Sequence, residues 1–217
     1  MVLPDVFKKI LPASFEGIGL RWIGLKAMPV ALVLMMVADV FARKADIKNV
    51  AISFFGFIYI SISLSLFFAI RGMFLNSAMS MFFPNVELMV PILVIVTVWV
   101  NDTMAYIVGS LIGRTPISPI SPKKTWEGTI AGVILSVVIL STIAGQYIPI
   151  ATKYLYMITL VASIMGNLGD LFESKLKRLA GVKDSGSMMP GHGGFLDRFD
   201  SVLFAGPFVW LLLQFIF

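Results

Sequence analysis

Long apolar runs alternate with short polar segments along most of the chain. Six of these runs are close to the roughly 20 mainly apolar residues that an α-helix needs to cross a bilayer; they lie at about 22–41, 50–70, 88–112, 128–149, 154–173 and 201–217. A further apolar stretch at about 73–83 is only about half that length, which leaves a tilted and a re-entrant segment both open. The pattern therefore predicts an all-α fold, a polytopic integral membrane helical bundle with about six or seven spans.

The composition supports a membrane protein throughout the chain. Of the 217 residues, 58% are hydrophobic and 13% are charged, whereas soluble domains are roughly 45–50% apolar and about 25% charged. An outer-membrane barrel is disfavoured because the apolar runs are continuous rather than alternating. There is no cysteine, so disulfide and thiol chemistry are excluded.

The positive charges indicate how the chain is oriented. The net charge is +5, and the cations lie in loops between apolar runs, where contact with the lipid bilayer explains them better than nucleic acid does. Loop 113–127 carries three Lys or Arg residues and loop 174–198 carries five, whereas the turn between the intervening spans has only Lys153. The positive-inside rule places both rich loops in the cytoplasm. Two cytoplasmic polar loops on the same side could share one site.

Residues 166–200 have nearly all the ingredients of a phosphate-and-metal site. They include five carboxylates (Asp170, Glu173, Asp184, Asp197 and Asp200), five cations (Lys175, Lys177, Arg178, Lys183 and Arg198) and the only histidine, His192. Mg²⁺ is usually held by one or two carboxylates together with substrate phosphates. Glycines around His192 would let backbone N–H groups approach an anion. The alternative is a solvated loop whose charges are paired for solubility.

Spacing sharpens the first interpretation. If 162–178 is one helix, four polar residues share a face because they follow steps of three, four and three; they are Asn167, Asp170, Ser174 and Lys177. Asp197 and Asp200 are also three apart, so a helix beginning near them would point both carboxylates the same way.

Two further polar positions lie outside this stretch. In loop 113–127, Lys123, Lys124 and Thr125 stand at a predicted helix start, which suits a phosphate. The alternative is a pair of topology-setting lysines beside an interfacial tryptophan. Asp102 lies within an apolar run and must face protein or a water-filled cavity; a helix-packing hydrogen bond is the alternative there.

The order of these residues closely resembles a known family. The run SKLKRLAGVKDSGSMMPGHGGFLDRFD, residues 174–200, is similar to the motif of phosphatidate cytidylyltransferases, also called CDP-diacylglycerol synthases. The matched positions are Ser174, Lys177, Arg178, Lys183, Asp184, Pro190, His192, Gly193, Gly194, Asp197, Arg198 and Asp200. The strings ISPKKTWEG and NDTMAYIVGSLIGR resemble further family motifs, so the resemblance covers about 101–201. Residues 1–100 carry no assignable motif, and we expect them to form one continuous membrane domain with the catalytic region 101–217.

The resemblance implies an enzyme of phospholipid biosynthesis, a CTP-dependent nucleotidyltransferase that converts CTP and phosphatidate to CDP-diacylglycerol and pyrophosphate. It implies Mg²⁺ as the cofactor, with a second cation left open. We expect the metal ligands to be Asp170, Asp197 and Asp200, and the catalytic group to include these with Lys177, Arg178 and His192. We expect the substrate-binding residues to be Lys123, Lys124, Thr125, Ser174, Lys183, Asp184, Gly193, Gly194, Arg198 and Asp102. The expected location is a bacterial inner membrane with the site facing the cytoplasm, and a homodimer is left open.

Two other functions remain as alternatives. One is a CTP-dependent polyprenol kinase of the dolichol kinase type, which would release CDP rather than pyrophosphate. The other is an ion or solute transporter, in which Asp39 and Asp102 would line a path. The concentration of charge in two loops, without an internal repeat, argues against a transporter.

Overall fold

A computed structural model describes residues 47–75, 78–83, 85–186, 194 and 196–217, together with isolated helical positions between 30 and 38. Most of the expected span at about 22–41, including Asp39, lies outside the described residues, as do His192 and Gly193. The chain divides into two compact units, Met1–Ser61 and Ile62–Phe217. All the candidate site residues belong to the second unit.

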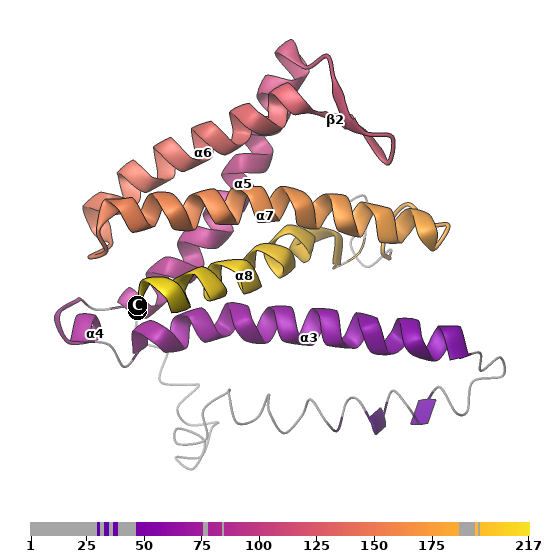
Figure 1. The fold of residues 1–217 in the computed structure, drawn as a ribbon, viewed down its shortest axis with the longest axis horizontal. Coiled ribbons are helices and arrows are strands. Elements are labelled where there is room, and N and C mark those ends of the chain that lie inside the picture. The colour runs from indigo at the N-terminus through magenta and orange to yellow at the C-terminus, as the bar shows by residue number, and fades with distance from the viewer. Residues whose placement is uncertain are drawn as a thin grey trace, which may run out of the picture. The chain divides into compact units, whose positions relative to one another are not determined.

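The described chain is almost entirely helical (Figure 1). Its helices are α3 (Ile47–Leu75), α4 (Ala78–Phe82), α5 (Val86–Ile112), α6 (Trp126–Tyr147), α7 (Thr152–Leu179) and α8 (Leu196–Ile216). Five of them, all but α4, are long and apolar enough to cross a membrane. The predicted class of a helical membrane protein is therefore confirmed for the part of the chain that the structure describes.

The stretch at 73–83 is divided between two helices. Helix α3 continues to Leu75, and α4 has only five residues, far fewer than the roughly 20 that a span requires. The described residues of 73–83 therefore belong to two helices, and the choice between a tilted and a re-entrant segment stays a prediction.

Loop 113–127 contains a small antiparallel hairpin that the sequence did not predict. Its strands are β1 (Pro116–Ser118) and β2 (Ser121–Thr125). The hairpin ends at Thr125, and α6 begins directly after it, which confirms the helix start expected next to Thr125.

The second polar loop is shorter than predicted because α7 extends to Leu179. Ser174, Lys177 and Arg178 therefore lie on the last turns of a helix rather than in a loop beginning at 174. Leu, Lys, Arg and Glu are good helix formers, and the first glycine after them is Gly181, which has a φ of 70°. Its N–H donates to the Arg178 carbonyl at 3.1 Å and the Val182 N–H donates to the Lys177 carbonyl at 3.0 Å. This left-handed C-terminal cap ends the helix.

Helices α5 to α8 pack around one core within the second unit. Helix α7 contacts α5, α6 and α8, and it runs alongside α8 in Figure 1. Fully buried apolar side chains from α5, α7 and α8 include Val94, Ile158 and Val209. The α7 polar side chains that reach α5 and α6 are therefore enclosed between helices.

Glycines allow α5 and α6 to approach closely. A Cβ atom on Gly128 would lie 2.5 Å from the Ala105 carbonyl oxygen, and one on Gly132 would lie 2.7 Å from the Asn101 carbonyl oxygen. Small residues at helix interfaces permit this close backbone contact in membranes. The contact brings the polar end of α5 against the start of α6.

We expect Gly132→Ala to destabilise the protein by about 1–3 kcal/mol, because the added methyl group forces the α5 backbone away. The matched control is Gly72→Ala, since a Cβ atom there meets nothing within 4 Å. Thermal unfolding in detergent should show a lower midpoint for Gly132→Ala and an unchanged or slightly higher one for Gly72→Ala. Equal midpoints for the two variants would contradict the close contact.

Candidate functional site

The hairpin that carries Lys124 is fixed to the start of α6. The Glu127 carboxylate accepts hydrogen bonds from the backbone N–H groups of Arg114 and Thr115, each at 3.2 Å. The Trp126 N–H donates to the Thr115 carbonyl at 2.9 Å. Thr125 Oγ1 accepts from the Gly128 N–H at 3.3 Å and caps α6. Thr125, predicted to bind substrate, thus has a structural role here, and Glu127 was not predicted at all.

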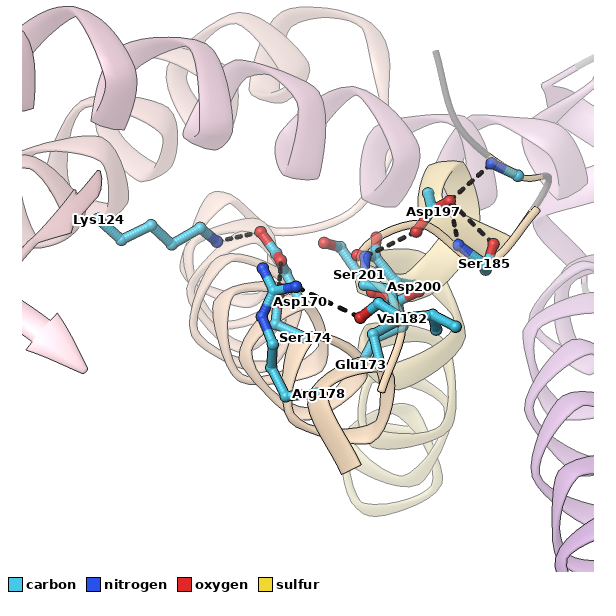
Figure 2. A network of polar contacts seen from close by, with 12 residues as sticks. Lys124, Asp170, Glu173, Ser174, Arg178, Val182, Ser185, Asp197, Asp200 and Ser201 are labelled. Carbon is cyan, nitrogen blue, oxygen red and sulfur yellow. Dashed lines mark hydrogen bonds and ion pairs between the residues drawn. The ribbon is translucent and has the colours of Figure 1, made fainter. Parts of the chain in front are cut away.

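Lys124 pairs with one carboxylate and interacts electrostatically with two more, and the three come from different helices. Its Nζ atom forms an ion pair with Asp170 of α7 and is shielded from solvent. Asp102 of α5 and Asp200 of α8 both interact electrostatically with Lys124 and with Asp170. Figure 2 shows Lys124 reaching toward Asp170, with Asp200 beyond it. We call Asp102, Asp170 and Asp200 the acid cluster; one lysine faces three carboxylates, so the cluster can bind further positive charge.

The Lys124–Asp170 pair brings the first polar loop to the polar end of α7, next to the second. The sequence placed loops 113–127 and 174–198 on the same side, and the Lys124–Asp170 pair joins the hairpin to the polar end of α7. Ser174 Oγ also donates to Asp170 Oδ1, at 3.3 Å. Asp170 is therefore the central residue of the site.

A second charged group lies between α7 and the start of α8. Lys177 Nζ lies 2.5 Å from Glu173 Oε2 and 2.6 Å from Asp197 Oδ1. Asp197 Oδ2 accepts from the Ser185 N–H and hydroxyl, both at 2.9 Å, and from the Gly194 N–H at 2.6 Å (Figure 2). Asp197 thus holds together Ser185 and Gly194, which flank the segment containing His192.

Gly194 is required at this position. A Cβ atom there would collide with Ser185 Oγ and lie 2.7 Å from the Gly186 nitrogen. The Gly194 N–H was predicted to approach a substrate anion. In the structure the anion it meets is the Asp197 carboxylate.

Other predicted residues lie at the surface of this end. The exposed ones are Lys123, Arg178, Lys183, Asp184 and Arg198. Arg178 donates to the Val182 carbonyl at 3.3 Å. Arginine and lysine side chains at a surface are the usual partners of phosphate groups.

The sequence reasoning missed several residues that shape the site. Glu173 is 1% exposed and holds Lys177; its spacing of four from Lys177 was the available signal. Asn101 and Asn167 are buried against each other beside the acid cluster. Asn167 had been placed on the polar face of its helix and Asn101 opens the string NDTMAYIVGSLIGR, but neither was included among the expected site residues.

The chemistry of the acid cluster suits a hard divalent ion bound together with phosphates. Within the described ranges, no group of three or more His, Cys, Asp or Glu residues has the arrangement of a protein-only metal site. Mg²⁺ at a nucleotide needs only one or two carboxylates, because phosphates and water supply the other ligands. Asp170 and Asp200 are neighbouring carboxylates from two helices and fit that requirement. Both oxygens of Asp197 are occupied by donors, and its assignment as a ligand stays a prediction.

The fold and the site together define a class of protein. It is a helical membrane protein in which α5, the hairpin, α7 and α8 bring acidic and basic groups together at one end. The sequence model of the cytidylyltransferase family matches residues 9–216, and the chain belongs to this family.

Relatives within bacteria point the same way. The chain is 50% identical over 121 residues to the phosphatidate cytidylyltransferase of Bacillus subtilis, an alignment that covers 54% of this chain and 45% of the relative. It is 49% and 48% identical, each over 118 residues, to the proteins of that name from Staphylococcus saprophyticus and Staphylococcus haemolyticus, with the same shares covered. The chain thus spans about half the length of the curated relatives it matches.

Proposed function

We propose that the chain catalyses cytidylyl transfer from CTP to phosphatidate at one face of a membrane, with a divalent cation, giving CDP-diacylglycerol and pyrophosphate. The observation that carries this proposal is the acid cluster around Lys124. Family membership and the names of the relatives supply the nucleotide and lipid classes. The charge distribution of the two polar segments favours the cytoplasmic face of a bacterial inner membrane, and the apolar runs favour six or seven spans in total.

The reaction requires charge neutralisation and positioning rather than a protein nucleophile. A phosphate oxygen of phosphatidate forms a bond to the α-phosphorus of CTP, and the bond from that phosphorus to the bridging oxygen of the β-phosphate breaks. The electron pair leaves with pyrophosphate. Both reactants are anions that repel one another, so cations must offset the charge and hold the two phosphates in line. The attacking phosphate is already ionised, and no general base is needed.

The residues divide this work in a consistent way. Asp170 and Asp200 would hold the divalent cation, which supplies electrostatic stabilisation of the triphosphate and the leaving pyrophosphate. Lys124 is placed to neutralise phosphate oxygens next to that position. The exposed cations Arg178 and Arg198 would bind the outer phosphates of the two substrates. The apolar surfaces of the helices let the acyl chains remain in lipid while the head group reaches the site.

The test is pyrophosphate release by the purified chain in detergent, supplied with phosphatidate, Mg²⁺ and CTP. We expect release only when CTP and phosphatidate are both present, and its loss on adding EDTA. ATP in place of CTP is the nucleotide control, and dolichol in place of phosphatidate is the lipid control. CDP formed with dolichol would instead indicate the polyprenol kinase, and a folded sample that releases no pyrophosphate would contradict the proposal.

A further inference from the structure

A reciprocal pair of buried amides lies directly beside the acid cluster. Asn101 of α5 is fully buried and Asn167 of α7 is 7% exposed. Asn101 Nδ2 donates to Asn167 Oδ1 at 3.1 Å, and Asn167 Nδ2 donates to Asn101 Oδ1 at 3.3 Å. Burying amides between apolar helices is costly unless they are paired. This pair therefore fixes one relative position of α5 and α7.

The remaining donors of both amides are also used. Asn101 Nδ2 donates a second hydrogen bond to Asp102 Oδ1 at 3.2 Å, and Asn167 Nδ2 donates to the Ser163 carbonyl at 3.0 Å. An amide has two N–H donors, and each of these amides also accepts from the other, so neither side chain can turn over without losing three hydrogen bonds. The orientation of both amides is consequently fixed by four contacts.

Each amide is linked to one carboxylate of the acid cluster. Asn101 precedes Asp102 in the chain and donates directly to its side chain. Asn167 precedes Asp170 by three positions on the same helix, so the two side chains lie on one face, one turn apart. The distance between Asp102 and Asp170 thus depends on the contact between the two amides.

Other buried polar pairs on the same face of α7 provide a comparison. Ser163 Oγ lies 2.9 Å from Ser136 Oγ of α6, and Thr159 Oγ1 lies 2.7 Å from Ser141 Oγ. Both pairs join α7 to α6 and lie farther from Asp170 along the helix. They stabilise helix packing in the same way, but neither contacts the acid cluster in the hydrogen bonds described. If the Asn pair only packed helices, it would behave like these pairs.

We propose that Asn101 and Asn167 are positioning residues that set the separation of Asp102 and Asp170 and thereby the affinity of the acid cluster for a divalent cation. The inference rests on the proposed function, because that cation is part of it. It goes further because it states that an uncharged pair of residues, enclosed between α5 and α7, determines how far apart two carboxylates of the site lie. Removing groups that orient metal ligands typically costs about 10–100-fold in metal affinity or activity.

The experiment compares two double variants of the full chain in detergent. Asn101→Leu with Asn167→Leu replaces the amide pair by apolar side chains, and Ser136→Ala with Ser163→Ala removes the matched hydroxyl pair. Mn²⁺ binding, followed by electron paramagnetic resonance without nucleotide, is the first readout; kcat and KM for CTP are the second. We expect the Asn variant to bind Mn²⁺ about 10–100-fold more weakly. Its kcat should fall by a larger factor than its KM for CTP changes. The Ser variant should keep the wild-type Mn²⁺ affinity, kcat and KM, even if its thermal unfolding midpoint is lower.

Two results would overturn the inference: wild-type Mn²⁺ affinity and kcat in the Asn variant, or equal losses in the Ser variant. If the Asn double variant does not fold, Asn101→Ala gives the same comparison with a smaller change. Wild-type protein that binds Mn²⁺ but releases no pyrophosphate contradicts the reaction, and the Mn²⁺ comparison then decides the positioning role separately. Wild-type protein that neither binds Mn²⁺ nor turns over contradicts both.

Discussion

Asp170→Asn is expected to lower pyrophosphate release by roughly 10²–10³-fold, the scale associated with removing one preorganised electrostatic group from an active site. Asp170 pairs with Lys124, accepts from Ser174 and neighbours Asp200. Asparagine preserves the shape of the side chain but removes the central negative charge. Steady-state kinetics at saturating CTP and phosphatidate, with Mg²⁺ varied, measures the change.

The matched control is Glu87→Gln, which removes one carboxylate from the first turn of α5. Glu87 lies fifteen residues before Asp102, about 22 Å away along the helix at 1.5 Å per residue. We expect this variant to keep wild-type turnover and Mg²⁺ dependence. Substantial turnover by Asp170→Asn would remove Asp170 from the proposed metal ligands, provided that both variants unfold at similar temperatures.

The apolar pattern predicted the helices well because bilayer thickness imposes a length on each run. The run at about 88–112 corresponds to α5 at Val86–Ile112, and the run at about 128–149 corresponds to α6 at Trp126–Tyr147. The polar spacing over 162–178 follows α7 almost to its end at Leu179, whereas the apolar run at about 154–173 stops before the helix does. Residues such as Lys177 are polar and favour the helix at the same time, so hydrophobicity alone could not place the boundary at Leu179.

The sequence predicted many of the residues that form the site, but not which of them contact one another. Loop charge predicted that loops 113–127 and 174–198 lie on the same side, and in the structure Lys124 of the first loop pairs with Asp170, four residues before the second. Helical spacing shows which residues share a face but not which element lies opposite that face. Lys177 was therefore expected in the catalytic group, whereas the structure gives it Glu173 and Asp197 as neighbours. Asn101 and Asn167 are 66 positions apart, and no local pattern in one sequence connects them.

Lys177 carries the other large expected effect. Lys177→Met removes the cation between Glu173, which is 1% exposed, and Asp197. Breaking a buried ion pair by removing one partner costs about 3–5 kcal/mol, because the remaining charge is left without compensation. We expect a lower thermal unfolding midpoint in detergent. We also expect Ser185 and Gly194 to be held less firmly, because both donate to Asp197.

The double variant Glu173→Gln with Lys177→Met separates this role from phosphate binding. Removing both charges leaves no buried uncompensated carboxylate at Glu173, so much of the lost stability should return. A Lys177 that only bound substrate phosphate would act differently: its single replacement would raise KM for CTP or phosphatidate and leave the unfolding midpoint unchanged. Recovery of the midpoint without recovery of turnover would mean that Lys177 does both, anchoring the start of α8 in the free protein and contacting phosphate during the reaction. Because Asp197 joins Lys177 to Ser185 and Gly194, the stability of this group also determines how firmly those two residues are held together.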